Sequence, residues 1–167
     1  TLIFVGGRTM TNSSYKSYEF TALDEASVLS AGDNQLNCGD SFTMPGGAAV
    51  CITVRDNDGY LSGDSRRNEN ADDKRGQTAT IEDVNGDEIG NGGQIYAEVY
   101  HGMMGSDGEW YLLIEIEQEG TNDDYYAFHE AYGVPEEGIE LTVQATCNVV
   151  KGGWNPDNKC LDAGEKE

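Results

Sequence analysis

Two short loops rich in Asp, Asn and Gly carry the residue types best suited to chemistry in this sequence. Each loop follows an apolar, strand-like run, at 50–54 and at 78–81. Hard cations such as calcium take six to eight oxygen ligands, and Asp or Asn at alternate positions with a Gly bend supplies them. The ligands that we expect are Asp56, Asp58, Tyr60 through its carbonyl, Asp64, Asp83, Asn85 and Asp87. Calcium is therefore the predicted cofactor.

Neither loop matches a standard calcium motif. In the first, Val54 and Ser65 stand where an EF-hand has its first and last ligands, and the flanks are strand-like rather than helical. The second resembles the start of a dockerin-type loop, but Glu88 stands where Gly is expected. The alternative is a turn in which the Asp and Asn side chains bond their own backbone.

A long polar segment at 65–75 contains no large apolar side chain and has two interpretations. Its basic residues are Arg66, Arg67, Lys74 and Arg75. They either pair with acidic neighbours in the same loop or form a partner-binding loop, because long loops on a rigid scaffold often carry recognition.

Catalytic signals are weak. The only histidines, His101 and His129, each end a strand-like run, no nucleophile elbow is present, and a zinc site would need both. We therefore predict that the chain is not an enzyme.

A glycan-binding or glycan-cleaving module is the alternative function. Glu115 and Glu117 lie on one face of a predicted strand, and paired carboxylates are the groups that glycoside hydrolysis uses. Trp110 and Tyr111 would contribute aromatic surface for a sugar ring.

The elements that must position these residues read as strands. Apolar and polar residues alternate over 18–23, 94–101, 110–117 and 139–149, which indicates strands with one buried and one wet face. Ile95, Ala97 and Val99 share one face of their strand, and Leu112, Ile114 and Ile116 point inward from the next. Over the whole chain we expect eight to ten strands. The predicted fold is one all-β domain over 1–167, an antiparallel β-sandwich of jelly-roll type.

Four cysteines are expected to form two disulfides. Cys38 and Cys51 enclose twelve residues, as do Cys147 and Cys160, so we favour these two pairings among the three that are possible. Disulfides form in oxidising compartments, which predicts an extracellular or particle-surface location.

Charge excludes several partners. The formal net charge is −21 at pH 7, from 31 acidic and 10 basic residues, so nucleic acid and anionic membranes would be repelled. No apolar run approaches the length of a membrane span, and we predict no membrane insertion. The start at Thr1, without Met or a leader, suggests a processed piece of a longer chain.

Several segments together resemble a known group of regions. They are Val54-Arg55-Asp56-Asn57-Asp58-Gly59, 61–64, 68–71, 76–81, 96–101, Leu113-Ile114-Glu115-Ile116-Glu117 and 141–149. These segments are similar to the β-rich regions ahead of Hint (hedgehog/intein-type) modules in secreted proteins of marine alphaproteobacteria, which often carry RTX-type calcium repeats. The Hint cysteine signature is absent here, so the resemblance implies a non-catalytic, secreted module and calcium, and no catalytic residue.

The function that we predict is a structural or adhesive β-module outside the cell, stabilised by calcium. Its expected partners are copies of itself or neighbouring subunits of a cell, fibre or virion surface, added through strand edges. The apolar run at 1–5 is one segment that could add to a neighbour's sheet. A glycan is the alternative partner.

Overall fold

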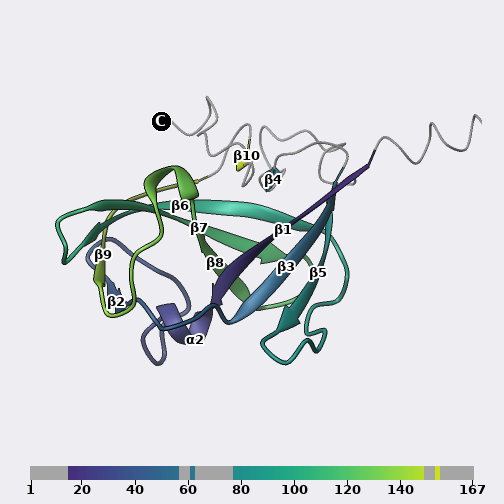
Figure 1. The fold of residues 1–167 in the computed structure, drawn as a ribbon, viewed down its shortest axis with the longest axis horizontal. Coiled ribbons are helices and arrows are strands. Elements are labelled where there is room, and N and C mark those ends of the chain that lie inside the picture. The colour runs from purple at the N-terminus through teal and green to yellow at the C-terminus, as the bar shows by residue number, and fades with distance from the viewer. Residues whose placement is uncertain (1–14, 57–60, 63–76, 149–152, 155–167) are drawn as a thin grey trace, which may run out of the picture.

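A computed structural model describes residues 15–56, 61–62, 77–148 and 153–154 of the chain. In this part the protein is an all-β structure with ten strands and two short helices (Figure 1). The strands are β1 (Lys16–Asp24), β2 (Ser41–Thr43), β3 (Val50–Asp56), β4 (Leu61–Ser62), β5 (Thr78–Asp83), β6 (Ile95–Gly105), β7 (Trp110–Gln118), β8 (Asp124–Phe128), β9 (Glu140–Asn148) and β10 (Gly153–Trp154). The helices are α2 (Glu25–Val28) and a 3-10 turn, η1 (Glu130–Tyr132).

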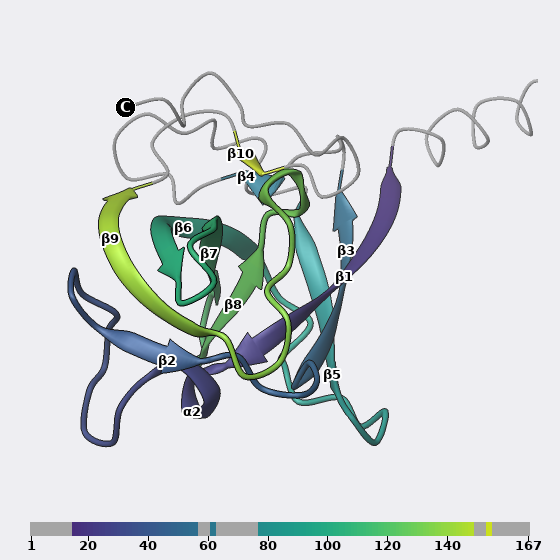
Figure 2. The ribbon, with the colours of Figure 1, turned by 60° about the vertical axis from the view of Figure 1, so that its left-hand side comes forward.

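Eight strands form one antiparallel sheet in the order β2-β9-β6-β7-β8-β1-β3-β5, and β4 pairs with β10 separately. The sheet curls into a half-barrel, with β9 and β2 at one side and β1, β3 and β5 at the other (Figure 2). The prediction of an all-β antiparallel fold is confirmed. The prediction of a two-sheet, jelly-roll-like sandwich is wrong, because β1 pairs with both β3 and β8 and so joins the two halves into one sheet.

Two apolar cores lie on opposite faces of the central strands. The first joins residues of β3, β5, β7 and β8, such as Ile52, Ile81, Ile114, Ile116 and Ala127. The second lies on the other face, where Val28 of α2 and Phe42 of β2 pack against Leu113 and Tyr126. Consecutive residues of β7 and β8 are therefore buried, whereas the sequence predicted one wet face per strand.

The two edges of the sheet differ. The β5 edge is covered by the chain that follows it, because Ile89 N–H donates to Ile81 O at 2.8 Å and Ala79 N–H donates to Gly93 O at 3.1 Å. The other edge, β2, has only three residues. We predicted that partners add to the edges of the sheet. A partner strand at β5 would have to displace the backbone at Ile89 and Gly93, which already bonds this edge.

The predicted pairing of Cys38 with Cys51 is wrong, because both thiols are free. Cys38 lies beside β9, with its Sγ 3.7 Å from Gln144 O, whereas Cys51 lies in β3. Four strands separate β9 from β3 in the sheet, so the geometry of a disulfide cannot be met. The other predicted pair involves the Cys147 side chain and Cys160, which lie outside the described residues.

No described helix is long and apolar enough to cross a membrane. The segment 65–75, with Arg66, Arg67, Lys74 and Arg75, also lies outside the described residues, so the predicted partner-binding loop stays a prediction.

Alkylation of the native protein tests the cysteine assignment. Cys38 is exposed, so we expect iodoacetamide to modify it without prior reduction. Cys51 should react more slowly, because burial and the nearby Glu19 and Glu82 carboxylates raise the pKa of its thiol. Peptide mass spectrometry measures both reactions. A peptide pair linked through Cys38 and Cys51 in the unreduced protein would contradict the assignment.

Candidate metal centre

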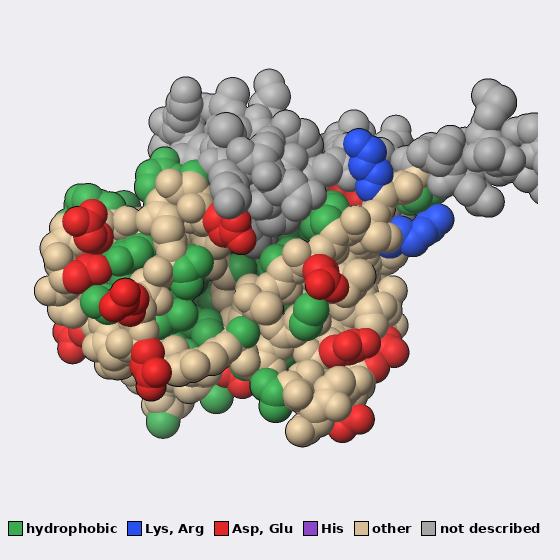
Figure 3. All heavy atoms as spheres, viewed as in Figure 1, with side chains coloured by type: hydrophobic (Ala, Val, Ile, Leu, Met, Phe, Trp, Pro, Cys, Tyr) green, Lys and Arg blue, Asp and Glu red, His purple; other side chains and the backbone are tan. Residues whose placement is uncertain are grey.

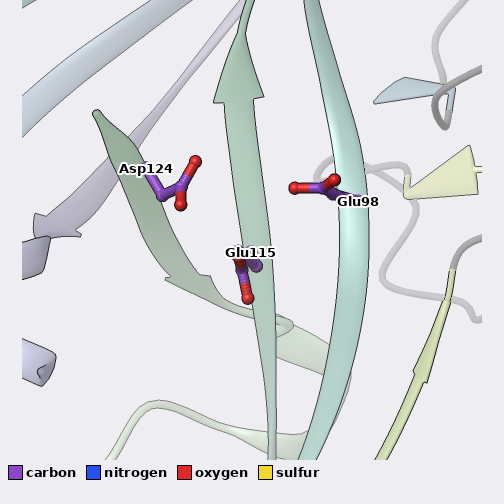
Figure 4. A group of neighbouring side chains, drawn as sticks. All are labelled: Glu98, Glu115 and Asp124. Carbon is purple, nitrogen blue, oxygen red and sulfur yellow. The ribbon is translucent and has the colours of Figure 1, made fainter. Parts of the chain in front are cut away.

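Three acidic side chains converge on one face of the sheet from its three central strands. Glu98 comes from β6, Glu115 from β7 and Asp124 from β8, and Figure 4 shows the Glu98 and Asp124 carboxylates turned toward one another across β7, which carries Glu115. One oxygen from each lies within 4.8 Å of the others. These three residues could hold a metal ion.

Strand register explains how Glu115 and Asp124 meet. The β6–β7 hairpin turns at 105–109, where Gly108 has a φ of 83°, and Asp107 accepts the Glu109 backbone N–H at 3.0 Å. In the next pair, Glu115 lies opposite Tyr126 and Glu117 lies opposite Asp124. Side chains two apart on a strand share a face, so Glu115, Glu117 and Asp124 are neighbours.

A β-bulge brings in Glu98. Ala97 pairs with Ile116, but the next paired residue of β6 is Val99, opposite Glu115, so Glu98 is the extra residue. Such a bulge turns side chains away from simple alternation. The predicted face of Ile95, Ala97 and Val99 is therefore wrong beyond Ala97, because Val99 leaves that face. Glu98 lies beside Glu115 on the face opposite Ala97, as predicted.

The carboxylates are poorly compensated within the described structure. Glu115 is buried, and Glu98 and Asp124 are half-buried. Lys16 and Arg55 are the only Lys and Arg residues in the described ranges, and the basic side chains in Figure 3 lie at one end of the molecule. In that part of the chain neither forms an ion pair with the cluster.

Two carboxyl groups of the cluster have raised pKa values, and no positive charge within the described residues offsets this shift. Burial, followed by the charges and hydrogen bond of Glu117 and the charges of Glu115 and Asp124, raises the pKa of Glu98 to about 8. Burial and the charges of Glu115, Glu117 and Glu25 raise the pKa of Asp124 to about 7. Two carboxyl groups therefore hold protons near neutral pH, where ordinary carboxyl groups are ionised.

Within the part of the chain that the structure describes, one side chain forms a hydrogen bond with Glu115. His101, which is also buried, lies with Nε2 at 2.8 Å from Glu115 Oε2. In the tautomer that carries its proton on Nε2, the imidazole donates this hydrogen bond to the carboxyl oxygen. The second oxygen of Glu115 is left for the cluster, and His101 fixes the orientation of the carboxylate.

A buried hydroxyl group next to the cluster has no hydrogen-bond partner among the described residues. Tyr126 is fully buried and its OH is unbonded, although it lies directly opposite Glu115 in the sheet. Burial and the charges of Glu115, Asp124, Glu25 and Glu98 raise its pKa well above the usual value for Tyr. Buried polar atoms without partners are rare in folded proteins.

The predicted calcium ligands lie elsewhere. Asp83 Oδ1 accepts the backbone N–H groups of Asn85 at 2.9 Å and Asp87 at 3.0 Å, with Gly86 at a φ of 82°. This is the self-bonded turn that the sequence offered as the alternative. Calcium at this loop stays a prediction, and the turn provides no support for it.

In the first loop only Asp56 is described. It is buried at the end of β3, where its Oδ2 accepts a hydrogen bond from Tyr18 OH at 3.2 Å. Asp58, Tyr60 and Asp64 lie outside the described residues, so calcium at this loop also stays a prediction.

Sequence reasoning found Glu115 and Glu117 but assigned them to a wet face, and it missed Glu98 and Asp124 as ligands. The hairpin signal at 106–108 was the usable clue, because pairing outward from that turn places Val99, the neighbour of Glu98, opposite Glu115. The bulge itself has no signal in the sequence that we can identify.

The pH dependence of stability tests the geometry of the cluster. In metal-free protein, the unfolded chain releases the Glu98 and Asp124 protons near pH 4, whereas the folded protein holds them until about pH 7 to 8. The folded state then binds more protons, so we expect stability to fall as pH rises from 4 to 8 and to level off above. Urea unfolding in EDTA measures this fall.

Two variants separate this effect from the general acidity of the chain. Glu98→Gln should flatten the profile and make the metal-free protein more stable than wild type at pH 8 to 9. Glu140→Gln, at an exposed position at the start of β9, should keep the wild-type slope. Equal slopes for wild type and Glu98→Gln would show that Glu98 is not in the environment described.

Comparison with known proteins identifies no relative of this chain. No family model matches the sequence, and neither the curated proteins nor the solved structures that were compared include a match. The resemblance to regions ahead of Hint modules therefore stays a prediction, and the function has to be argued from the residues themselves.

Proposed function

We propose that this chain is a non-catalytic, extracellular β-module whose central sheet is stabilised by a bound hard divalent cation, calcium. The observation that carries the proposal is the convergence of Glu98, Glu115 and Asp124 from three adjacent strands, with oxygens within 4.8 Å of one another.

Ligand chemistry supports a hard cation. The three residues offer only carboxylate oxygens, which suit calcium, magnesium and manganese rather than metals that favour thiolates. Three carboxylates supply between three and six oxygens, and water can complete the six to eight that calcium takes. A bound cation would also remove the repulsion that raises the pKa of Glu98 and of Asp124.

Position supports a structural role. β6, β7 and β8 are consecutive in the sheet, so one ion would link three strands whose pairing holds the curl together. Calcium sites of extracellular modules often have dissociation constants of roughly 10⁻⁴ to 10⁻³ M, which suits an ion that is abundant outside cells. Salt and cations in such surroundings would also screen the repulsion within a chain of formal net charge −21.

The glycan alternative has less support from the geometry. Trp110 is exposed and begins β7, whereas Glu115 lies five residues along the strand, roughly 17 Å away. Tyr111 is buried, and its OH donates to Asp107 at 2.6 Å. One sugar ring could not contact both Trp110 and Glu115, so glycan binding or cleavage remains the second proposal.

Calcium titration tests the proposed function. In a chelator-treated sample at pH 7.5, calcium at a hundredfold excess over its dissociation constant should stabilise the fold by about 2.7 kcal/mol. For a chain of this size that corresponds to a rise in melting temperature of roughly 5 to 10 °C. Thermal unfolding followed by circular dichroism measures the rise, with magnesium and equal ionic strength as comparisons.

Variants then locate the site. Glu98→Gln and Asp124→Asn should each remove most of the calcium-dependent rise while leaving a folded protein, and Glu140→Gln should retain all of it. If Glu98→Gln responds to calcium as wild type does, the ion binds elsewhere and the proposal is wrong. A screen for polysaccharide hydrolysis with wild type and Glu115→Gln addresses the alternative.

A further inference from the structure

A second site lies where the sheet divides. β1 pairs with β8 only at Leu23 and Asp24, and from Lys16 to Ala22 it pairs with β3 instead. The two strands separate beyond Leu23, and a cavity of about 470 Å³ lies in the gap. It shares no lining residue with the triad Glu98, Glu115 and Asp124.

The cavity lies at the seam between the two apolar cores, where residues of one core meet residues of the other. Leu23, Tyr126 and Phe128 belong to the second core, whereas Ala22 and Ala127 belong to the first, and all five line the cavity. Figure 3 shows a hollow of this character, with hydrophobic side chains gathered inside and acidic side chains around them. For scale, an engineered apolar cavity of about 150 Å³ is enough to bind benzene.

Two loops wall the cavity and hold each other in place. Met44 N–H donates to Ile139 O at 2.8 Å, and Gly138 N–H donates to Met44 O at 2.9 Å. Pro45 and Pro135, one from each loop, also line the cavity and restrict the backbone there. The walls are therefore formed before any ligand arrives, which lowers the entropic cost of binding.

The charged groups of the lining are all acidic. Glu19, Glu130 and Glu137 contribute carboxylates, and the lining that is described contains no Lys, Arg or His. The Glu137 carboxylate lies against Gly46, so close that a Cβ there would be 2.8 Å from its Oε1. Glu137 is thereby positioned at the cavity by the absence of a side chain on Gly46.

We propose that this cavity binds a small organic cation, an ammonium group attached to an apolar or aromatic body. The body would occupy the apolar seam, where Phe128 and Leu23 offer contact, and the ammonium group would face Glu19 and Glu137. Aromatic faces and carboxylates together are the surroundings in which proteins recognise organic ammonium ions.

Three ligands of one shape test the charge preference. Benzylammonium, benzyl alcohol and benzoate carry the same ring with a cationic, a neutral and an anionic group. In 150 mM salt with EDTA, we expect benzylammonium to bind with a dissociation constant of roughly 1 mM or tighter, as suits a ligand of its size. Benzyl alcohol should bind at least tenfold more weakly and benzoate not at all, as measured by NMR titration.

Variants assign the binding to the cavity. Glu19→Gln with Glu137→Gln should reduce the affinity for benzylammonium to that for benzyl alcohol. The matched pair Glu82→Gln with Glu140→Gln removes the same charge from exposed positions of other strands and should change the affinity less than twofold. Ala48→Phe, which adds a ring to the lining, should abolish binding of both ligands without lowering the melting temperature by more than a few degrees.

Three results would overturn the proposal. They are equal binding of benzylammonium and benzyl alcohol, equal loss in the two charge-matched pairs, and no binding of benzylammonium at 10 mM. Glu98→Gln should bind benzylammonium as wild type does. Loss of binding in this variant would be a fourth contrary result, because it would place the ammonium group at the acidic triad. Because calcium is absent throughout, failure here leaves the proposed cation site unaffected.

Discussion

Burial of the central strands on both faces is the constraint on which the rest of the structure depends. One eight-stranded sheet has to provide two cores, one on each face of its central strands, and Val28 of α2 completes the second. In β7, Ile114, Glu115 and Ile116 are consecutive and all buried. A carboxylate in such a strand has no wet face to occupy, so its charge must be met by a proton, a donor or a cation.

The acidic cluster follows from that constraint. His101 supplies one donor to Glu115, and raised pKa values let Glu98 and Asp124 keep protons where carboxyl groups are normally ionised. Protons and a metal ion are alternatives for the same oxygens, because ligands bind metal in their deprotonated form. The bulge at Glu98 therefore has a consequence beyond local shape, since a regular β6 would leave only two strands contributing.

The sequence allowed part of this to be predicted. The strands of 94–101, 110–117 and 139–149 could be located, because alternation of apolar and polar residues is a local property. The single curled sheet could not, because it depends on β1 changing partner from β3 to β8, and no pattern within β1 marks that change. The same limit explains the wrong pairing of Cys38 with Cys51, since equal loop lengths say nothing of which strands come together.

The site shows the same division between local and non-local information. Asp83, Asn85 and Asp87 were singled out for their spacing, yet spacing of this kind also serves a turn, and the backbone N–H groups occupy Asp83. Glu98, Glu115 and Asp124 are each isolated in sequence and meet only through strand register. Clusters built across strands are thus less visible in a sequence than clusters within a loop, although the rigid sheet holds them more firmly.

The change of partner along β1 also connects the two sites that the structure contains. Where β1 leaves β8, buried residues of both cores line the cavity, and the loops at 44–48 and 134–137 form the rest of its wall. Where β8 instead stays paired with β7, Asp124 is held against Glu117 and Glu115. Strand β8 therefore contributes Asp124 to the acidic cluster at one end and Phe128 to the cavity at the other. A cation that tightens the pairing of β7 with β8 would also stiffen one wall of the cavity, so the two sites share a structural element although they share no ligand.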